Sequence, residues 1–322
     1  MKIGRHPILF TSMFLFHPIK STRAILKSFD DLLYGLHTKL DQQERRLHLV
    51  QEALGRVENR QVSNIQSENL NDYEFRVFSQ WGEDGIIQHL IRNLDIPRKQ
   101  FVEFGVQDYR ECNTRFLLVN NNWSGLVMDD SAANILRIKK DFIYWAYDLT
   151  PVQAFVTRDN INQLLRENGV TGEIGLLSID IDGNDFWIWR AIDVINPVIV
   201  VIEYNHRFGH QAAVTIPYEE KFDRYKTGHA PFYFGASLQA LCWLAKRKGY
   251  AFVGCSSNGV NAFFVRRDKQ PPNIRELSPE EGYFEGKFSE TVDENRLPIR
   301  KDRNEERDLL MKLDLVDVNS LE

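Results

Sequence analysis

The residues with the clearest chemical potential follow two apolar runs in the middle of the chain. Each run is continuous, which is typical of strands buried on both faces of a parallel α/β sheet. Polar side chains come at or just beyond the ends of these runs: Asp180, Asp182, Glu203 and Asn205. Because such sheets bind ligands beyond the carboxyl ends of their strands, we expect these four groups to meet in one crevice. The alternative is that single carboxylates only cap the helices that follow.

A second set of polar positions lies upstream. Glu103 comes near the end of a strand expected at residues 100–105, and Gly105 opens the turn after it. Glycine at such a turn lets the backbone approach a nucleoside closely. Gln107 and Tyr109 stand where the second and third glycines of a G-x-G-x-G turn would be, so the turn alone does not define a nucleotide site.

Two further acids extend this pattern. Asp129 ends the next expected strand, where a carboxylate can accept hydrogen bonds from both hydroxyls of a ribose, and Asp130 is the neighbouring candidate. Asp148 follows a weak third strand expected at residues 142–147 and lies where an adenine amino group is often held. A turn cap before Thr150 explains Asp148 equally well.

The elements that must position these residues alternate between strands and helices. Helices are expected at residues 79–94, 115–120, from 132, 158–168 and 236–248. This alternation predicts a parallel, doubly wound sheet. It stops at residues 206–234, a length typical of functional loops. Two strands at 250–255 and 261–267, joined by a short Asn-Gly connection, are expected to close the domain as an antiparallel pair.

Near the N-terminus, apolar residues recur at alternating intervals of three and four. Apart from Gln43, every such position is apolar: Leu26, Phe29, Leu33, Leu36, Leu40, Leu47, Val50, Leu54 and Val57. This heptad seam predicts a parallel coiled-coil dimer or trimer, the alternative being a helix that lies on its own domain. We therefore divide the chain into a basic segment with a coiled-coil helix (1–68), an α/β domain (69–267) and a charged, peripheral extension (268–322).

Composition narrows the functional classes. The 322 residues carry a net charge of −5, which gives no general attraction for nucleic acid, so none is expected as a partner. The three widely spaced cysteines argue against a disulfide framework or a metal site and fit a cytoplasmic protein. Residues 1–29 carry five basic residues, no acid and an apolar cluster too short to span a bilayer. They fit a poor signal peptide, a partner-packed end or peripheral contact with an anionic membrane.

Several motifs together resemble the FkbM-type family of class I S-adenosylmethionine methyltransferases. They are Glu103-x-Gly105, Asp129, S-Q-W-G-E-D at 79–84, and I-D-I-D-G-N-D at 179–185 followed by V-I-V-V-I-E-Y at 198–204. The resemblance covers about residues 75–267. The family motif usually reads D-x-E-G-x-E, so aspartates replace glutamates here. The resemblance implies a seven-stranded, mostly parallel Rossmann-like methyltransferase sheet with an antiparallel last strand.

The resemblance also implies a reaction, the O-methylation of an acceptor hydroxyl with S-adenosylmethionine. Glu103, Gly105, Asp129 and Asp148 would hold the methyl donor. Asp180, Asp182 and His206 would form the catalytic set, with Asp182 or His206 as the general base. Glu203, Asn205 and Arg207 would bind the acceptor. Aromatic rings and arginine in the long loop suit a sugar, glycan or other small polyhydroxyl acceptor.

Two other functions use the same carboxylates. Asp180-x-Asp182 also resembles the metal-binding D-x-D of nucleotide-sugar glycosyltransferases, although that interpretation leaves Glu103 and Asp129 without a role. The third possibility is a scaffold protein that keeps the methyltransferase fold without turnover. Methyltransferase activity accounts for most of the motifs.

Overall fold

The computed structural model describes residues 18–226, 231–288 and 302–321. The chain falls into two compact units, Met1–Gln51 and Glu52–Glu322. Their boundary lies inside one long helix, α1 (Pro18–Val62). Residues 1–17, which carry much of the segment proposed for membrane contact, lie outside the described residues. Among the helices of the described ranges, none has the length and hydropathy needed to cross a bilayer.

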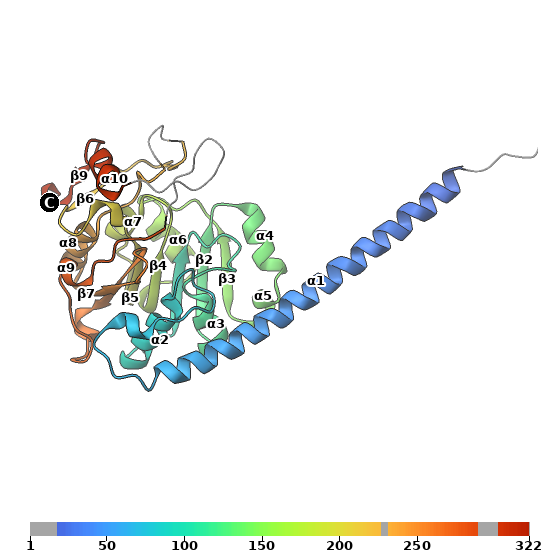
Figure 1. The fold of residues 1–322 in the computed structure, drawn as a ribbon, viewed down its shortest axis with the longest axis horizontal. Coiled ribbons are helices and arrows are strands. Elements are labelled where there is room, and N and C mark those ends of the chain that lie inside the picture. Colours follow the sequence, from blue (N-terminus) through green and yellow to red (C-terminus); the bar gives the residue numbers. More distant parts are fainter. Residues whose placement is uncertain (1–17, 227–230, 289–301, 322) are drawn as a thin grey trace, which may run out of the picture. The chain divides into compact units, whose positions relative to one another are not determined.

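The second unit is built on a seven-stranded sheet. Across the sheet the strands are β3 (Leu149–Gln153), β2 (Ser124–Asp129), β1 (Gln100–Phe104), β4 (Gly172–Ile179), β5 (Ile195–Glu203), β8 (Asn261–Arg266) and β7 (Tyr250–Cys255). β1 to β5 pair in parallel, and β8 pairs antiparallel with both β5 and β7. This is a Rossmann-like methyltransferase sheet, so the predicted fold class is confirmed (Figure 1).

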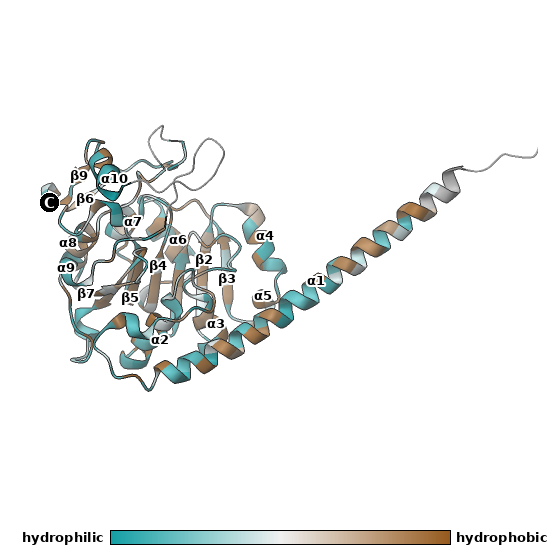
Figure 2. Ribbon diagram, in the orientation of Figure 1, coloured by the Kyte–Doolittle hydropathy of each residue, from teal (hydrophilic) through white to brown (hydrophobic). Residues whose placement is uncertain are grey.

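Helices cover both faces of this sheet. One apolar core lies against α6 (Ile161–Glu167), α7 (Asp185–Ala191) and α8 (Leu238–Lys248). The other lies against α2 (Glu83–Asn93), α3 (Arg115–Asn121), α4 (Ala132–Lys140) and α5 (Phe142–Ala146). Because the strands face a core on both sides, their sequences are continuously apolar (Figure 2).

The third strand is not where the sequence placed it. Residues 142–146 form helix α5, which begins after Asp141, whose side chain accepts a hydrogen bond from the Ile143 N–H. The strand is β3, which pairs with β2 at the edge of the sheet and contains Pro151. An edge strand tolerates proline because one side of its backbone needs no strand partner. The proline made this segment hard to recognise as a strand.

The C-terminal extension is part of the domain, contrary to expectation. Helix α10 (Arg303–Leu310) and strand β9 (Val316–Asp317) pack on the segment after β5, and β9 pairs with β6 (Val214–Thr215). Leu310 is fully buried, and Arg207 forms a buried ion pair with Glu306, with 3.1 Å between Nε and Oε2. The remaining short elements are η1 (Leu70–Tyr73), η2 (His206–Phe208), η3 (Arg267–Lys269), α9 (Pro279–Gly282) and η4 (Val318–Ser320).

Candidate active site

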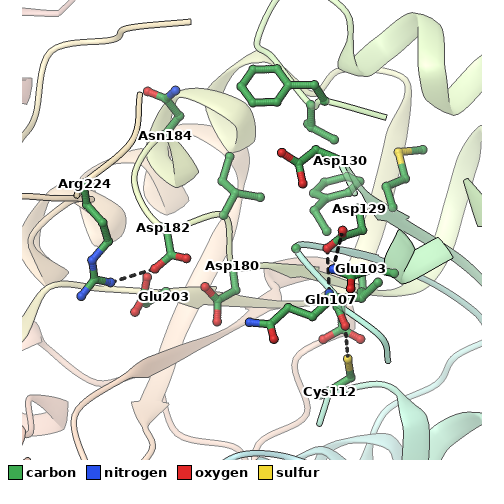
Figure 3. A pocket seen from close by; sticks show the side chains of 18 of the residues that line it. Glu103, Gln107, Cys112, Asp129, Asp130, Asp180, Asp182, Asn184, Glu203 and Arg224 are labelled. Atoms are coloured by element: carbon green, nitrogen blue, oxygen red, sulfur yellow. Dashed lines mark hydrogen bonds and ion pairs between the residues drawn. The ribbon is translucent and has the colours of Figure 1, made fainter. Parts of the chain in front are cut away.

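A cavity of about 1010 Å³ opens at the carboxyl ends of the parallel strands (Figure 3). Its walls come from the segments that follow β1, β2, β3, β4 and β5, and from residues 219–226 of the long loop. Parallel strands all end at the same edge of a sheet, so side chains far apart in sequence converge there. Of the residues predicted to form a site, the cavity is lined by Glu103, Gly105, Asp129, Asp180, Asp182 and Glu203.

Glu103, at the end of β1, anchors the loop that forms one wall. Its carboxylate accepts hydrogen bonds from the Asn113 N–H (2.9 Å), the Thr114 N–H (3.2 Å) and hydroxyl (2.5 Å), and the Ser178 hydroxyl (3.2 Å). Burial raises the pKa of Glu103, and these hydrogen bonds oppose that rise. Glu103 therefore fixes the shape of residues 106–114 from beneath.

The turn after β1 keeps a glycine-type backbone although it has lost two glycines. Gly105 has a φ of +73°, and a Cβ there would lie 1.7 Å from the backbone oxygen of Asp180. Gln107 and Tyr109 also adopt left-handed conformations, with φ of 48° and 61°. Each costs roughly 1–2 kcal/mol in a residue other than glycine. The fully buried Tyr109 forms a hydrogen bond of 2.9 Å with the Thr114 hydroxyl, and Gln107 lines the cavity (Figure 3).

Asp129 connects the turn after β1 to the start of α4. Its Oδ2 accepts a hydrogen bond from the Gln107 N–H (2.8 Å), while Oδ1 accepts from the Ser131 N–H and the Asn134 amide, both at 3.0 Å. A carboxylate offers about four acceptor positions, so Asp129 can still accept one more hydrogen bond, from a ligand. Asp130 also lines the cavity.

The structure places Asp148 away from the cavity. Because β3 begins at Leu149, Asp148 precedes this strand, and its carbonyl oxygen accepts a hydrogen bond from the Gly125 N–H at the start of β2. Asp148 thus lies at the amino edge of the sheet, opposite the cavity. The cavity wall beyond the carboxyl end of β3 is apolar and is formed by Ala154, Phe155 and Val156.

Asp180 and Glu203 form the floor beyond β4 and β5. No described residue donates a hydrogen bond to the side chain of either, and Oε2 of Glu203 is buried without a partner. Burial raises the pKa of both carboxyl groups well above the usual range, and repulsion from the neighbouring Asp182 and Asp185 raises it further. Arg224 lowers both pKa values but does not cancel the rise.

The other two aspartates of the D-I-D-G-N-D motif are engaged by the protein. Asp185 accepts hydrogen bonds from the N–H groups of Ile181 (2.9 Å) and Gly183 (3.0 Å), and burial raises its pKa to about 6. Asp182, with a φ of 57°, accepts a hydrogen bond of 2.8 Å from the Arg224 guanidinium (Figure 3). Its carboxylate is thus paired with an arginine. Across the described ranges, no cluster of three or more His, Cys, Asp or Glu side chains is arranged to hold a metal ion.

Three predicted residues after β5 lie outside the cavity. Asn205 is fully buried, and its amide donates hydrogen bonds to the backbone oxygens of Phe232 and Phe234. Arg207 is held in the ion pair with Glu306. His206 packs against the ring of Phe288, and burial together with nearby arginines lowers its pKa to about 2. A histidine held neutral and away from the cavity cannot take a proton from an acceptor there.

Two residues that line the cavity were missing from the predicted site. Arg224 is buried, donates to the Pro231 oxygen and stacks on Phe234, with 4.1 Å between its guanidinium carbon and the ring centroid. Its only sequence signal was its position in the long loop after β5. Gln80 belongs to S-Q-W-G-E-D, in which Asp84 accepts hydrogen bonds from three backbone N–H groups, at residues 77–79. This motif supported the family resemblance, but its role became visible only in the structure.

Comparisons with known proteins agree with the fold at low sequence identity. No protein-family model matches the chain, and no curated protein matches it in sequence. Solved structures that resemble it include an O-methyltransferase from Bacillus cereus in complex with SAH, with 13% identity and a TM-score of 0.37 over 57% of this chain and 79% of that one. Another is an S-adenosylmethionine-dependent methyltransferase from Clostridium acetobutylicum, with 10% identity and a TM-score of 0.35 over 57% of this chain and 89% of that one. These similarities concern the fold alone.

Proposed function

We propose that this protein is an S-adenosylmethionine-dependent O-methyltransferase of the FkbM type. The observation that carries the proposal is the left-handed turn of Gly105 and Gln107, which faces Asp129 on one side and Asp180 and Glu203 on the other, within one cavity. Within the described ranges, no donor forms a hydrogen bond with the side chain of Asp180 or Glu203. Such a turn lets a nucleoside approach the backbone closely. The motifs that resemble the family supply the same residues.

The residues of the cavity fit the methyl donor. The apolar wall of Ala154, Phe155 and Val156, beside Met128, suits an adenine ring, and Asp129 has capacity for a ribose hydroxyl. The carboxylates at the ends of β4 and β5 suit a cationic sulfonium group. When bound, S-adenosylmethionine would supply an electrophilic methyl group on that sulfonium.

Asp180 is the best placed general base. It lines the cavity and has no hydrogen-bond donor among the described residues, and its raised pKa makes it a stronger base than an ordinary aspartate. It would accept the proton of the acceptor hydroxyl while the acceptor oxygen takes the methyl group. Arg224 would act as a positioning residue, since it holds Asp182 and lowers the pKa of Asp180 and Glu203.

The rim of the cavity supports a polyhydroxyl acceptor. It carries the polar side chains of Gln80, Arg110 and Lys226 and the ring of Tyr225, which is 74% exposed. Polar groups that can donate and accept hydrogen bonds, together with an exposed ring, suit a sugar or glycan. The rim therefore supports the proposed acceptor class, and the turn after β1 supports the proposed donor.

Calorimetry of the full chain with SAH, and separately with a nucleotide sugar plus Mn²⁺, tests the proposal. We expect micromolar binding of SAH alone. Gly105→Ala should abolish this binding because its Cβ would collide with the Asp180 oxygen. Gly169→Ala is the matched control, since Gly169 has a similar φ of +72° with open space around it. Binding of the nucleotide sugar alone would support a glycosyltransferase, and binding of neither ligand would support a scaffold.

A further inference from the structure

The heptad seam of α1 faces solvent along its whole described length. Its a positions are leucines that are 42–67% exposed, and the apolar d positions are 47–56% exposed: Leu26, Leu33, Leu40, Leu47 and Leu54 at a, and Phe29, Leu36, Val50 and Val57 at d. A continuous apolar stripe of this kind on a soluble protein marks an interaction surface. Figure 2 shows the apolar residues recurring along the helix.

The last turns of α1, which belong to the second unit, show which face of the helix contacts the domain. Within the second unit, the helix contacts the domain through Glu52, Gly55, Asn59 and Val62. The Asn59 amide donates to Gln88 Oε1 at 3.0 Å, and a Cβ on Gly55 would lie 2.4 Å from a methyl group of Val77. At 3.6 residues per turn these positions lie on the face opposite Leu54 and Val57. In these last turns the domain therefore contacts one face of α1 and leaves Leu54 and Val57 exposed.

Charges beside the seam select the direction of a partner helix. Three e positions of the seam carry acids, Asp30, Glu44 and Glu58, and a fourth carries His37. The charged g positions are all basic: Lys39, Arg46 and Arg60. In a parallel arrangement g of one helix faces e of the next, so Lys39 meets Glu44 of the neighbouring helix. In an antiparallel arrangement g faces g and e faces e. Basic residues would then meet basic residues and acids would meet acids, so these pairs would repel, except the pairs that contain His37.

The residues inside the seam bear on the number of helices. Leucine fills every a position, and β-branched valine occupies two d positions, which is the reverse of the pattern that favours two-stranded coils. Ile25 and Leu32, at g, widen the apolar stripe and are 69% and 59% exposed. Gln43, at d, would meet Gln43 of the other chains only when the helices are in register, and any shift would bury its amide against apolar side chains.

From these observations we propose that α1 assembles with α1 of further copies of this chain into a parallel, in-register bundle of three or more helices. The occupant of the exposed seam is thus the same helix. This parallel arrangement attaches the methyltransferase-type domains at one end of the bundle. The proposal does not depend on the activity assigned to the domain.

Light scattering of the full chain at micromolar concentration tests the assembly. We expect a particle of at least three protomers. Leu40→Glu should reduce its mass, because it places a charge in the seam, whereas Gln42→Glu, a neighbouring exposed position outside the seam, should not. A monomeric or dimeric wild-type particle would overturn the proposal, as would an unchanged mass in Leu40→Glu.

Charge exchange tests the direction. In the parallel bundle, Lys39→Glu and Glu44→Lys should each raise the dissociation constant roughly two- to five-fold, and the double variant should restore it. Sedimentation over a range of concentrations measures this constant. In an antiparallel assembly Lys39→Glu would instead relieve repulsion between g positions and lower the constant. A lowered constant, or a double variant weaker than both single variants, would exclude parallel pairing.

Discussion

Two pairs of carboxylates line the same cavity but differ in how many hydrogen bonds they accept from the protein. The carboxylates of Glu103 and Asp129 receive four and three hydrogen bonds from the protein. Those of Asp180 and Glu203 receive none from the described residues. The first pair holds the loop of residues 106–114 and the start of α4 in place. The second pair remains available to a ligand.

The number of hydrogen bonds that a carboxylate accepts thus distinguishes residues that stabilise the fold from residues available for a reaction. Residue type alone does not make this distinction. A buried carboxylate satisfied by backbone N–H groups stabilises the fold, whereas one left unsatisfied destabilises it unless a ligand compensates. Such destabilised groups are typical of functional sites. Asp180 and Glu203, which are half-buried, fit this description in part, and substitutions in the two pairs should therefore act in opposite directions on stability.

The largest effect is expected for Asp180→Asn. Loss of the general base should lower the rate of methyl transfer from S-adenosylmethionine to a panel of methyl glycosides by about 10²–10⁴-fold. The same variant should be more stable at pH 8. Because the folded pKa of Asp180 is raised, its contribution to stability falls as pH rises above the unfolded pKa, and asparagine removes that loss.

Turnover and urea unfolding at pH 8 measure the two effects of Asp180→Asn. The control is Asp193→Asn, whose side chain is 73% exposed and which does not line the cavity. A variant that is inactive but also less stable would show that Asp180 stabilises the fold, as Glu103 and Asp129 do. The proposed difference between the two pairs of carboxylates would then be wrong.

An intermediate effect is expected for Glu103→Gln. The amide would turn an N–H₂ group toward the N–H groups of Asn113 or Thr114, which should lower the free energy of unfolding by about 1–3 kcal/mol. Urea denaturation at pH 7 measures it. Glu111→Gln is the control, because the Glu111 side chain is half exposed in the same loop. Equal midpoints for the two variants would show that the hydrogen bonds to Glu103 contribute nothing.

The smallest effect is expected for His206→Leu, and it depends on pH. The pKa of His206 is about 2 in the folded protein against 6.5 unfolded, so between these values the unfolded state binds more protons and stability falls as pH falls. At pH 5 this costs the wild type about 2 kcal/mol relative to pH 8, and leucine should abolish that cost. Urea unfolding at both pH values, with His210→Leu as control, measures it. Turnover should change less than threefold, and a large loss would return His206 to the catalytic set.

Local sequence patterns were enough to predict which carboxylates meet. Continuous apolar runs end in acids, and strands that alternate with helices typically pair in parallel, so Glu103, Asp129, Asp180 and Glu203 are expected to gather at one edge. The heptad spacing likewise determined that α1 is a helix with one apolar stripe. Both inferences depend on the spacing of apolar residues along the chain, which does not depend on tertiary contacts.

The role of each residue at that edge depends on long-range contacts in the folded chain. Asp148 was predicted at the wrong edge because Pro151, which an edge strand tolerates, made β3 hard to recognise in the sequence. His206 and Arg207 instead contact Phe288 and Glu306, which lie far away in sequence. Gln107 keeps a glycine-type backbone because Asp129 accepts its N–H. Hydrogen-bond partners and burial are long-range properties, and the local sequence does not contain them.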